Sequence, residues 1–449
     1  MAAVDVAPDP VRPELFGPGR RATTVGLLLI TLVTAFEAMG VGTAMPAVIA
    51  DLGAVSAYAW PIATFLAASV LGTVLGGRFS DARGPRATLL LGPVVFGVGL
   101  VVAGTAGALP QLLVGRVLQG LGAGALMIAS MVTIAAVYPE RARPAVFGLI
   151  SGAWVLPSLV GPPLAGFVTE RLSWHWVFLG LVPVVVLALA LVVPAARRLT
   201  PPDHPTPARP GLVAAAAGAA AGVTALSWAA QHPGALGAGA AVGALAVLVP
   251  SLHRLLPAGV FRARRGVPAV VAARGLLAGV FFTVNSYVPL MLTATHGWTL
   301  TAAGVPLVTA SLGWTASSAW QGRRPDVPRA TLLRVGFCLV AAGAAGLLPV
   351  ASGWAPGWLA APAWTLAGLG MGVGFSAVSF LLLRHSPAGE VGASSAAAQL
   401  ADQLTTAALV GAGGGLLALL ATPAAALTAL LVPLVVLAGI GAVLARRAG

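Results

Sequence analysis

Two carboxylates stand within long apolar stretches of this chain, Glu37 and Asp402. A charged carboxylate inside a membrane span costs about 3 kcal/mol on insertion scales, so residues of this kind are functional candidates by default. A carboxylate there could carry a proton, or it could form an ion pair with a buried cation. Arg116 and Arg274 are the two arginines within apolar stretches, and they are the candidate partners.

Glu37 is the stronger candidate for carrying a proton. It lies nine residues before Pro46, and Arg116 lies about six residues from the outer end of its own stretch, so at about 1.5 Å per residue the two have similar depth. Gly40 shares the helical face of Glu37 and leaves room beside it. One interpretation is a proton site and the other is a structural ion pair with Arg116. The two are compatible, because a neighbouring arginine would also tune the carboxylate.

Asp402 and Arg274 form the second candidate pair, because both lie inward from the same end of their stretches. Structural pairing is favoured slightly over a role in proton coupling. Gln399 and Gln403 flank Asp402 and would give a polar wall to a cavity.

The composition places these residues in a bilayer. Of the 449 residues, 58% are hydrophobic and 8% are charged, and the mean hydropathy is +0.95. Soluble domains carry roughly 25% charged residues. The net charge of +13 would suggest nucleic acid in a soluble protein. Here the arginines gather in short loops, so the lipid bilayer is expected as partner and nucleic acid is not.

The sequence lacks the residue patterns that other functions need. Cys338 is the single cysteine, which excludes a disulfide framework and a cysteine metal site. The six histidines show no ligand spacing, and there is neither a Gly-x-x-x-x-Gly-Lys nucleotide loop nor a nucleophile paired with a base. We therefore expect no metal, no cofactor, no drive by ATP and no enzymatic activity.

Fourteen apolar runs are long enough to cross a bilayer as helices of about 20 residues. They lie at 23–45, 57–77, 87–107, 109–137, 144–169, 174–195, 211–230, 234–252, 267–292, 299–321, 330–350, 358–383, 391–421 and 423–444. The acidic, proline-rich N-terminus does not resemble a cleaved signal peptide. We expect an all-α polytopic protein with a tail 1–22, a six-helix bundle 23–195, a linker 196–210, two inserted helices 211–252, a linker 253–265, a second six-helix bundle 266–445 and a tail 446–449.

Arginine placement predicts the orientation. All 25 basic residues are arginine; Arg171 falls in an outside loop and two lie within spans, which leaves 22 inside if the N-terminus is inside and the spans alternate. This is a strong positive-inside signal. It predicts a multi-pass protein of the cell membrane, inner or plasma, with both termini cytoplasmic. Removing helices seven and eight together would keep the bias, so the count of fourteen rests on their apolar length.

A charged loop is repeated in the two halves. GGRFSDARGPRATLL at 76–90 recurs as the shorter QGRRPDVPRATLL at 321–333, with PRATLL identical. Matching loops in two halves indicate a transporter built by internal duplication.

The first copy resembles the loop between helices two and three of the major facilitator superfamily, although Ala82 and Pro85 stand where that family commonly has basic residues. The resemblance implies the major facilitator fold. It makes Asp81 a gate latch that pairs with nearby arginines and with the start of helix thirteen near Gly392 in the outward-open state. The alternative is a loop that only sets topology. The gating-loop residues of the two copies are Gly77, Asp81, Gly84, Arg86, Asp326 and Arg329, and the second copy also keeps Gly322.

Three further motifs resemble the fourteen-helix drug:proton antiporter branch of that family. Glu37 resembles its acidic residue nine places before a proline, with Glu where Asp is more usual, and Arg116 begins an Arg-x-x-Gln-Gly motif. The third motif resembles the antiporter signature of helix five, which implies export. Close Gly and Pro residues there would also let the helix bend and a neighbour approach; ordinary packing of small residues is the alternative. Its members are Gly152, Pro157, Gly161, Pro162 and Gly166.

This resemblance implies a proton-coupled exporter of amphipathic small organic compounds, such as drugs or antibiotics, that works by alternating access as a monomer. Glu37 would be the principal proton site, and a central carboxylate would suit a cationic substrate. A proton-coupled importer of a small metabolite and a non-transporting membrane sensor are the alternatives. Helices one and nine face the cavity in this family, which adds Asn285 and Tyr287 of helix nine to an expected cavity wall that already holds Gln399 and Gln403.

Overall fold

The computed structural model describes residues 15–17, 20–54, 57–199, 211–324, 326–387 and 390–448. Within these ranges all regular elements are helical and no strand occurs. Most of the predicted N-terminal tail, and residues 200–210 of the predicted linker, lie outside the described residues.

The first half of the chain forms a bundle that begins at Arg21. Its helices are α2 (Arg21–Asp51), α3 (Trp60–Arg83), α4 (Pro85–Gly104), α5 (Leu109–Val137), α6 (Arg143–Ala153), α7 (Val155–Arg171), α8 (His175–Leu179) and α9 (Val182–Ala196). Two helices follow, α10 (Leu212–Gln231) and α11 (Ala235–Leu255). The second bundle contains α12 (Val267–His296), α13 (Leu300–Ala303), α14 (Val305–Gly322), α15 (Arg329–Gly346), α16 (Leu348–Ala351), α17 (Ala360–His385), α18 (Val391–Leu419) and α19 (Pro423–Leu444).

Twelve helical segments of the described chain are long and apolar enough to cross a membrane. Two more, α13–α14 and α18, lie where the tenth and thirteenth spans are predicted. Both carry polar side chains within their apolar sequence, such as Ser317 in α14 and Asp402 in α18, which lowers their hydropathy. The all-helical fold is thus confirmed, and a helical segment lies at each predicted run. The number of membrane crossings beyond twelve stays a prediction.

The helix packing of the first half recurs in the second. In the first half α2 packs against α7 and α9, α4 against α5 and α9, and α3 against α5. In the second half α12 packs against α18 and α19, α15 against α17 and α19, and α14 against α17. Counting along each half, these are the same pairs in the same order. The packing therefore supports the internal duplication that the repeated loop indicates.

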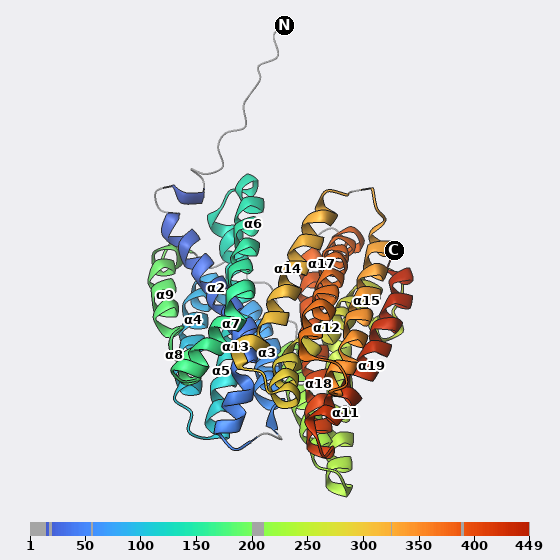
Figure 1. Ribbon diagram of the computed structural model, residues 1–449. Coiled ribbons are helices and arrows are strands. Elements are labelled where there is room, and N and C mark those ends of the chain that lie inside the picture. Colours follow the sequence, from blue (N-terminus) through green and yellow to red (C-terminus); the bar gives the residue numbers. More distant parts are fainter. Residues whose placement is uncertain are drawn as a thin grey trace.

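The two halves touch toward one end of the bundle. Figure 1 shows the first half (blue to green) beside the second (yellow to red), with the ends of α6 and α14 apart on the face where the C-terminus lies. We call this the loop face, because the α3–α4 turn at Gly84 also lies there. At the opposite face the Tyr58 hydroxyl donates to the Ser286 carbonyl at 2.7 Å, and α7 packs against α13 and α14.

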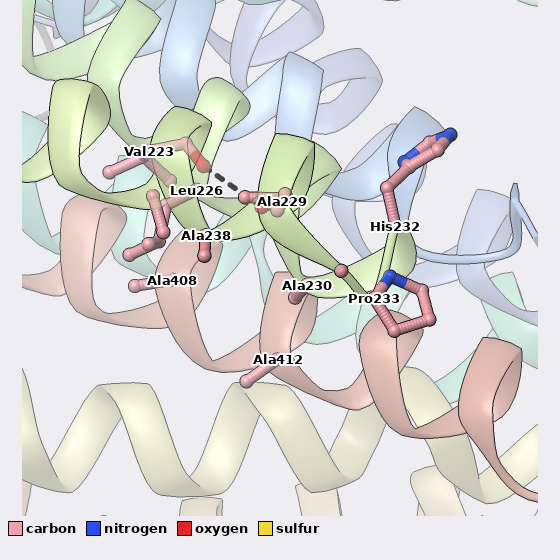
Figure 2. Close-up of a pocket in the computed structure, with 13 residues that line it drawn as sticks. Val223, Leu226, Ala229, Ala230, His232, Pro233, Ala238, Ala408 and Ala412 are labelled. Atoms are coloured by element: carbon pink, nitrogen blue, oxygen red, sulfur yellow. Dashed lines mark hydrogen bonds between the residues drawn. The ribbon is translucent and has the colours of Figure 1, made fainter.

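Helix α10 packs against both halves. It contacts α3 of the first half and α18 of the second, as well as α11, through small residues that include Ala215, Ala216 and Ala219. Between α10, α11 and α18, near the opposite face, lies a cavity of about 410 Å³ with a mainly apolar lining (Figure 2). The inserted pair therefore covers one side of the junction between the halves.

Gly84 explains why the α3–α4 turn is so short. It is the single residue between the two helices, and its φ of 80° and ψ of 166° lie in a region that is open to glycine and closed to residues with a Cβ atom. Pro85 then begins α4, where its missing N–H has no helical partner to lose. Gly84 and Pro85 of the first copy thus have backbone roles, and Val327 stands at the position of Gly84 in the second copy.

Close contact between α3 and α5 gives a first prediction. A Cβ atom on Gly124 would lie 2.6 Å from the backbone nitrogen of Thr73, and closer still to the Ser69 carbonyl. Gly124→Ala should therefore lower stability by about 1–3 kcal/mol, the usual range for overpacking, as measured by thermal unfolding in detergent. Gly148→Ala is the control, because nothing lies within 4 Å of its added Cβ. Equal melting temperatures for the two variants would contradict the prediction.

Candidate functional site

Glu37 and Arg116 form a buried ion pair between α2 and α5. Arg116 Nη1 contacts Glu37 Oε1, and the two side chains, in the order Arg116 and Glu37, are 4% and 1% exposed. The predicted equal depth of the two residues explains the contact. Oε2 of Glu37 is buried and has no hydrogen-bond partner within the described residues.

Three groups from α3 and α5 hold the Arg116 guanidinium in addition to Glu37. Its Nε donates to the carbonyl of Pro61 at 2.9 Å, and Nη1 also donates to Oε1 of Gln119 at 2.7 Å. Its carbon Cζ lies 4.4 Å from the centre of the Phe65 ring, a cation–π geometry. A carbonyl oxygen has two lone pairs, so Pro61 can accept from the arginine while it takes part in α3. Groups of α3 and α5 thus hold the Arg116 guanidinium in place, and Glu37 of α2 pairs with it there.

Helix five is interrupted at Trp154, within the motif that predicts a bend, although the backbone of Trp154 keeps helical angles. Helix α6 ends at Ala153 and α7 begins at Val155. Ala153 stands four residues before Pro157, and a proline ring clashes with the carbonyl at that position. The break therefore follows from Pro157, which is buried, whereas Gly152 is exposed.

The rest of that motif lies between Glu37 and the second half. A Cβ on Gly40, one turn after Glu37, would lie 3.3 Å from the Gly161 carbonyl, so α7 packs on the face of α2 that carries the carboxylate. A Cβ on Gly166 would lie 2.5 Å from the Thr301 nitrogen of α13. Helix α7 thus contacts both the helix of Glu37 and the other half.

Asp402 and Arg274 form the second ion pair, between α18 and α12. Arg274 Nε donates to Oδ2 of Asp402 at 2.9 Å, and Nη2 donates to Oε1 of Gln399 at 3.3 Å. The guanidinium also lies 4.5 Å from the centre of the Phe375 ring. Oδ1 of Asp402 and Oε1 of Gln403 are buried without a partner among the described residues.

The other predicted cavity residues differ in their surroundings. Oδ1 of Asn285 accepts a bond from Trp364 Nε1 at 3.0 Å, and Asn285 is half-buried. Tyr287 is 3% exposed, its hydroxyl donates to the Val410 carbonyl at 2.6 Å, and its ring centre lies 5.3 Å from that of Tyr58. Tyr287 therefore packs within the junction at the opposite face.

The predicted gate latch is not formed in this arrangement. Asp81 and Arg86 are exposed, and among the described residues no hydrogen bond or ion pair to Asp81 is found. A Cβ atom added to Gly392, at the start of α18, would have nothing within 4 Å. In the second copy Asp326 is exposed, and Arg329 lies 5.2 Å from the centre of the Phe380 ring.

Tyr138 ties α2 to the segment after α5 at the loop face. Its hydroxyl lies 2.7 Å from Oγ1 of Thr24, and its carbonyl accepts a bond from Arg143 Nε at 3.1 Å. Burial raises the pKa of Tyr138 above its ordinary value, so this hydroxyl stays protonated and available for the bond.

Sequence reasoning missed a contact between the halves at Glu170. Oε1 accepts the Thr301 N–H at 2.9 Å and Oε2 accepts the Thr301 hydroxyl at 2.8 Å. Both residues lie at helix ends, where the sequence gives no sign of a partner 131 positions away.

The Glu170 contact gives a second prediction. The test introduces Ser286→Cys in a Cys338→Ser background and measures its reaction with an impermeant maleimide. Adding Glu170→Ala should speed this reaction about fivefold. The factor corresponds to a loss of about 1 kcal/mol in the free energy that favours the closed junction between the halves. The reason is that Ser286 lies in the same junction, beside Tyr58. Glu140→Ala is the control, since Glu140 has a 90% exposed side chain on the loop face. Equal labelling rates in the two variants would show that Glu170 does not hold the junction closed.

Two matching helical halves, joined toward one end and carrying ion pairs inside apolar helices, define a polytopic membrane transporter. The chain matches the family model described as Major Facilitator Superfamily over residues 27–408. It belongs to this family.

Curated relatives match over part of their length. Multidrug resistance protein 3 of Bacillus subtilis (strain 168) is 34% identical over 169 residues, 38% of this chain and 33% of that protein. Multidrug transporter protein MdtP of the same organism is 29% identical over 173 residues, 38% of this chain and 32% of that protein. An uncharacterized MFS-type transporter of Mycobacterium tuberculosis is 31% identical over 229 residues, 50% of this chain and 33% of that protein. The matches thus span about a third of these relatives' lengths.

Solved structures show the same fold at low identity. A POT family transporter in complex with 5-aminolevulinic acid has a TM-score of 0.73 at 14% identity, covering 98% of this chain and 100% of that one. A bacterial homolog of the human lysosomal transporter Spinster has a TM-score of 0.67 at 16% identity, covering 96% and 98%.

Proposed function

We propose that this protein is a proton-coupled exporter of amphipathic small organic compounds, drugs and antibiotics among them, of the fourteen-helix antiporter branch. It acts as a monomer in the cell membrane, with both termini cytoplasmic. The names of two relatives, a multidrug resistance protein and a multidrug transporter, support drug export. The arginines near the loop face support the orientation.

The observation that carries this proposal is the buried pair of Glu37 and Arg116. One oxygen of Glu37 faces the arginine, and the other has no partner within the described residues. The free oxygen is the place for a proton. A proton there neutralises Glu37 and weakens its attraction to Arg116, so proton binding and helix contacts depend on each other.

The arrangement of the halves supports the cytoplasm-facing step of an alternating-access cycle. The halves touch at the face opposite the loop face, and the latch at Asp81 is open. We assign this arrangement to the form that faces the cytoplasm. In the proposed cycle this form follows release of the proton from Glu37 to the cytoplasm, which leaves a charged carboxylate to pair with Arg116. Helix α7, which contacts both α2 and α13, is the element that would transmit the change to the other half.

Asp402 has the structural role in this scheme. Its arginine is held by a carboxylate, an amide and a ring at once, which favours a permanent pair. A role for Asp402 in coupling is the fallback if Glu37 proves dispensable.

The test uses inside-out membrane vesicles with an acid interior. Amphipathic compounds are added outside, and loss of protons from the interior is followed, against vesicles without the protein. Export coupled to protons predicts proton loss that depends on both the compound and the protein. No proton loss with any compound, from folded and inserted protein, would contradict the proposal and favour an importer or a sensor.

A further inference from the structure

The second half carries a row of aromatic rings that the proton site does not use. Trp364 stacks on Phe281 with ring centres 4.9 Å apart. Phe281 meets Trp314 edge to face at 5.7 Å, and Trp314 lies 5.5 Å from Phe375. Phe282 flanks Trp314 at 6.1 Å. The rings of α12, α14 and α17 therefore form one connected row.

The row is fixed on one side and accessible on the other. Trp364 and Phe281 are 0% and 4% exposed, so they anchor it. Phe282, Trp314 and Phe375 are only half-buried, so protein does not cover these residues completely. Side chains held in place before binding lose little freedom when a flat ligand stacks on them.

The row ends at a charge that is already neutralised. The Arg274 guanidinium lies 4.5 Å from the centre of the Phe375 ring and donates to Oδ2 of Asp402 at 2.9 Å. Asp402 is 6% exposed, and its Oδ1 has no hydrogen-bond partner within the described residues. A buried acceptor without a partner is costly. A ligand that brings an O–H or N–H group would satisfy it.

The charges of the interior disfavour a cationic ligand. Glu37 and Asp402 lie in the middle of described apolar helices, whereas Asp51, Asp81 and Glu170 lie at helix ends. Each of the two central carboxylates has an arginine partner. A cation beside either pair would meet no net negative charge, yet it would still lose its hydration. A neutral hydrogen-bond donor loses far less free energy in the same transfer.

We propose that Phe282, Trp314 and Phe375, with Oδ1 of Asp402 at the end of the row, form the substrate-binding wall. The wall takes flat, uncharged aromatic compounds that bear a hydroxyl or N–H group. This inference rests on the proposed function, because a wall that selects substrate presupposes a transporter. It replaces the expectation of a cationic substrate with a neutral one.

A matched pair of compounds tests the choice of substrate. 2-Naphthol and the (2-naphthyl)trimethylammonium ion share one ring system, and they differ in carrying a neutral donor or a fixed positive charge. Binding to the purified protein in detergent is followed by naphthyl fluorescence, and transport by proton loss from vesicles. We expect the ammonium ion to bind at least about tenfold more weakly, equivalent to about 1.4 kcal/mol.

Variants of the row test the site. Trp314→Leu should weaken binding of 2-naphthol about tenfold through loss of ring stacking, and Trp314→Phe about threefold. The milder variant keeps the test valid if the leucine variant does not fold, which size-exclusion chromatography checks. Trp354→Leu is the control, because Trp354 is 90% exposed in the turn after α16, and it should bind 2-naphthol as the parent does.

The two measurements separate this inference from the proposed function. Equal affinity for both compounds, or affinity for 2-naphthol that survives both Trp314 variants, would overturn the wall even if export is observed. Binding of 2-naphthol that depends on Trp314, without transport of any compound, would uphold the wall and refute the exporter.

Discussion

Glu37→Gln should abolish proton loss from acid-loaded vesicles on addition of a transported compound, lowering coupled export at least about a hundredfold, the scale of a lost proton-transfer group. Glutamine keeps the size of the side chain and can still accept a bond from Arg116. It cannot gain or release a proton at this position. The variant should therefore bind compound as the parent does while failing to exchange it for protons.

Glu140→Gln provides the control for the Glu37 experiment. It makes the same chemical change at a side chain that is 90% exposed, so coupled export should be unaffected. Proton loss that persists in Glu37→Gln would move the coupling elsewhere. Asp402→Asn, measured in the same vesicles, would then show whether the second pair carries the proton.

The second large effect is expected on stability. Arg116→Met should destabilise the protein by about 3–5 kcal/mol, because it leaves the carboxylate of Glu37 buried without its cation. Glu37 is 1% exposed, so water cannot replace the arginine. The variant also leaves the Pro61 carbonyl and Gln119 without their donor. Thermal unfolding in detergent measures the loss.

A double variant separates the buried charge from lost packing. Glu37→Leu combined with Arg116→Met removes both charges at similar volume, so most of the stability should return although export does not. Arg171→Met is the control for a surface arginine, with an expected change within about 0.5 kcal/mol. If the Arg116→Met and Arg171→Met variants have the same melting temperature, the ion pair does not stabilise the fold.

Helix positions and the depth of charges could be predicted from the sequence because both are one-dimensional properties. A run of apolar residues sets where a span begins and ends, and counting along it sets the depth of Glu37 against Arg116. The same counting placed Asp402 beside Arg274. These two contacts are present in the structure, although their roles in transport stay predictions.

Contacts that depend on the rotation of a helix could not be predicted. Most of these helices are apolar on all faces, so no amphipathic pattern shows which side meets a neighbour. Phe65 and Phe375 lie over the two arginines, and nothing in their sequence positions indicates it. Tyr287 was expected to line a cavity but packs in the junction with Tyr58, for the same reason. The Glu170–Thr301 contact joins the two halves, and its position depends on how they assemble.

Helix α10 has a mechanical consequence for any motion between the halves. It is wedged against α3 on one side and α18 on the other, so it cannot travel with both when they rotate apart. One of its two helix contacts must therefore slide. The small side chains of Ala215, Ala216 and Ala219 interlock little with a neighbouring helix, so they would oppose this sliding only weakly. The inserted pair would then let one half slide past it while it keeps lipid from entering along this flank. On the opposite flank α7 packs against α13 and α14, so a compound entering sideways from the bilayer would have to pass between α6 and α14, whose ends lie apart at the loop face (Figure 1).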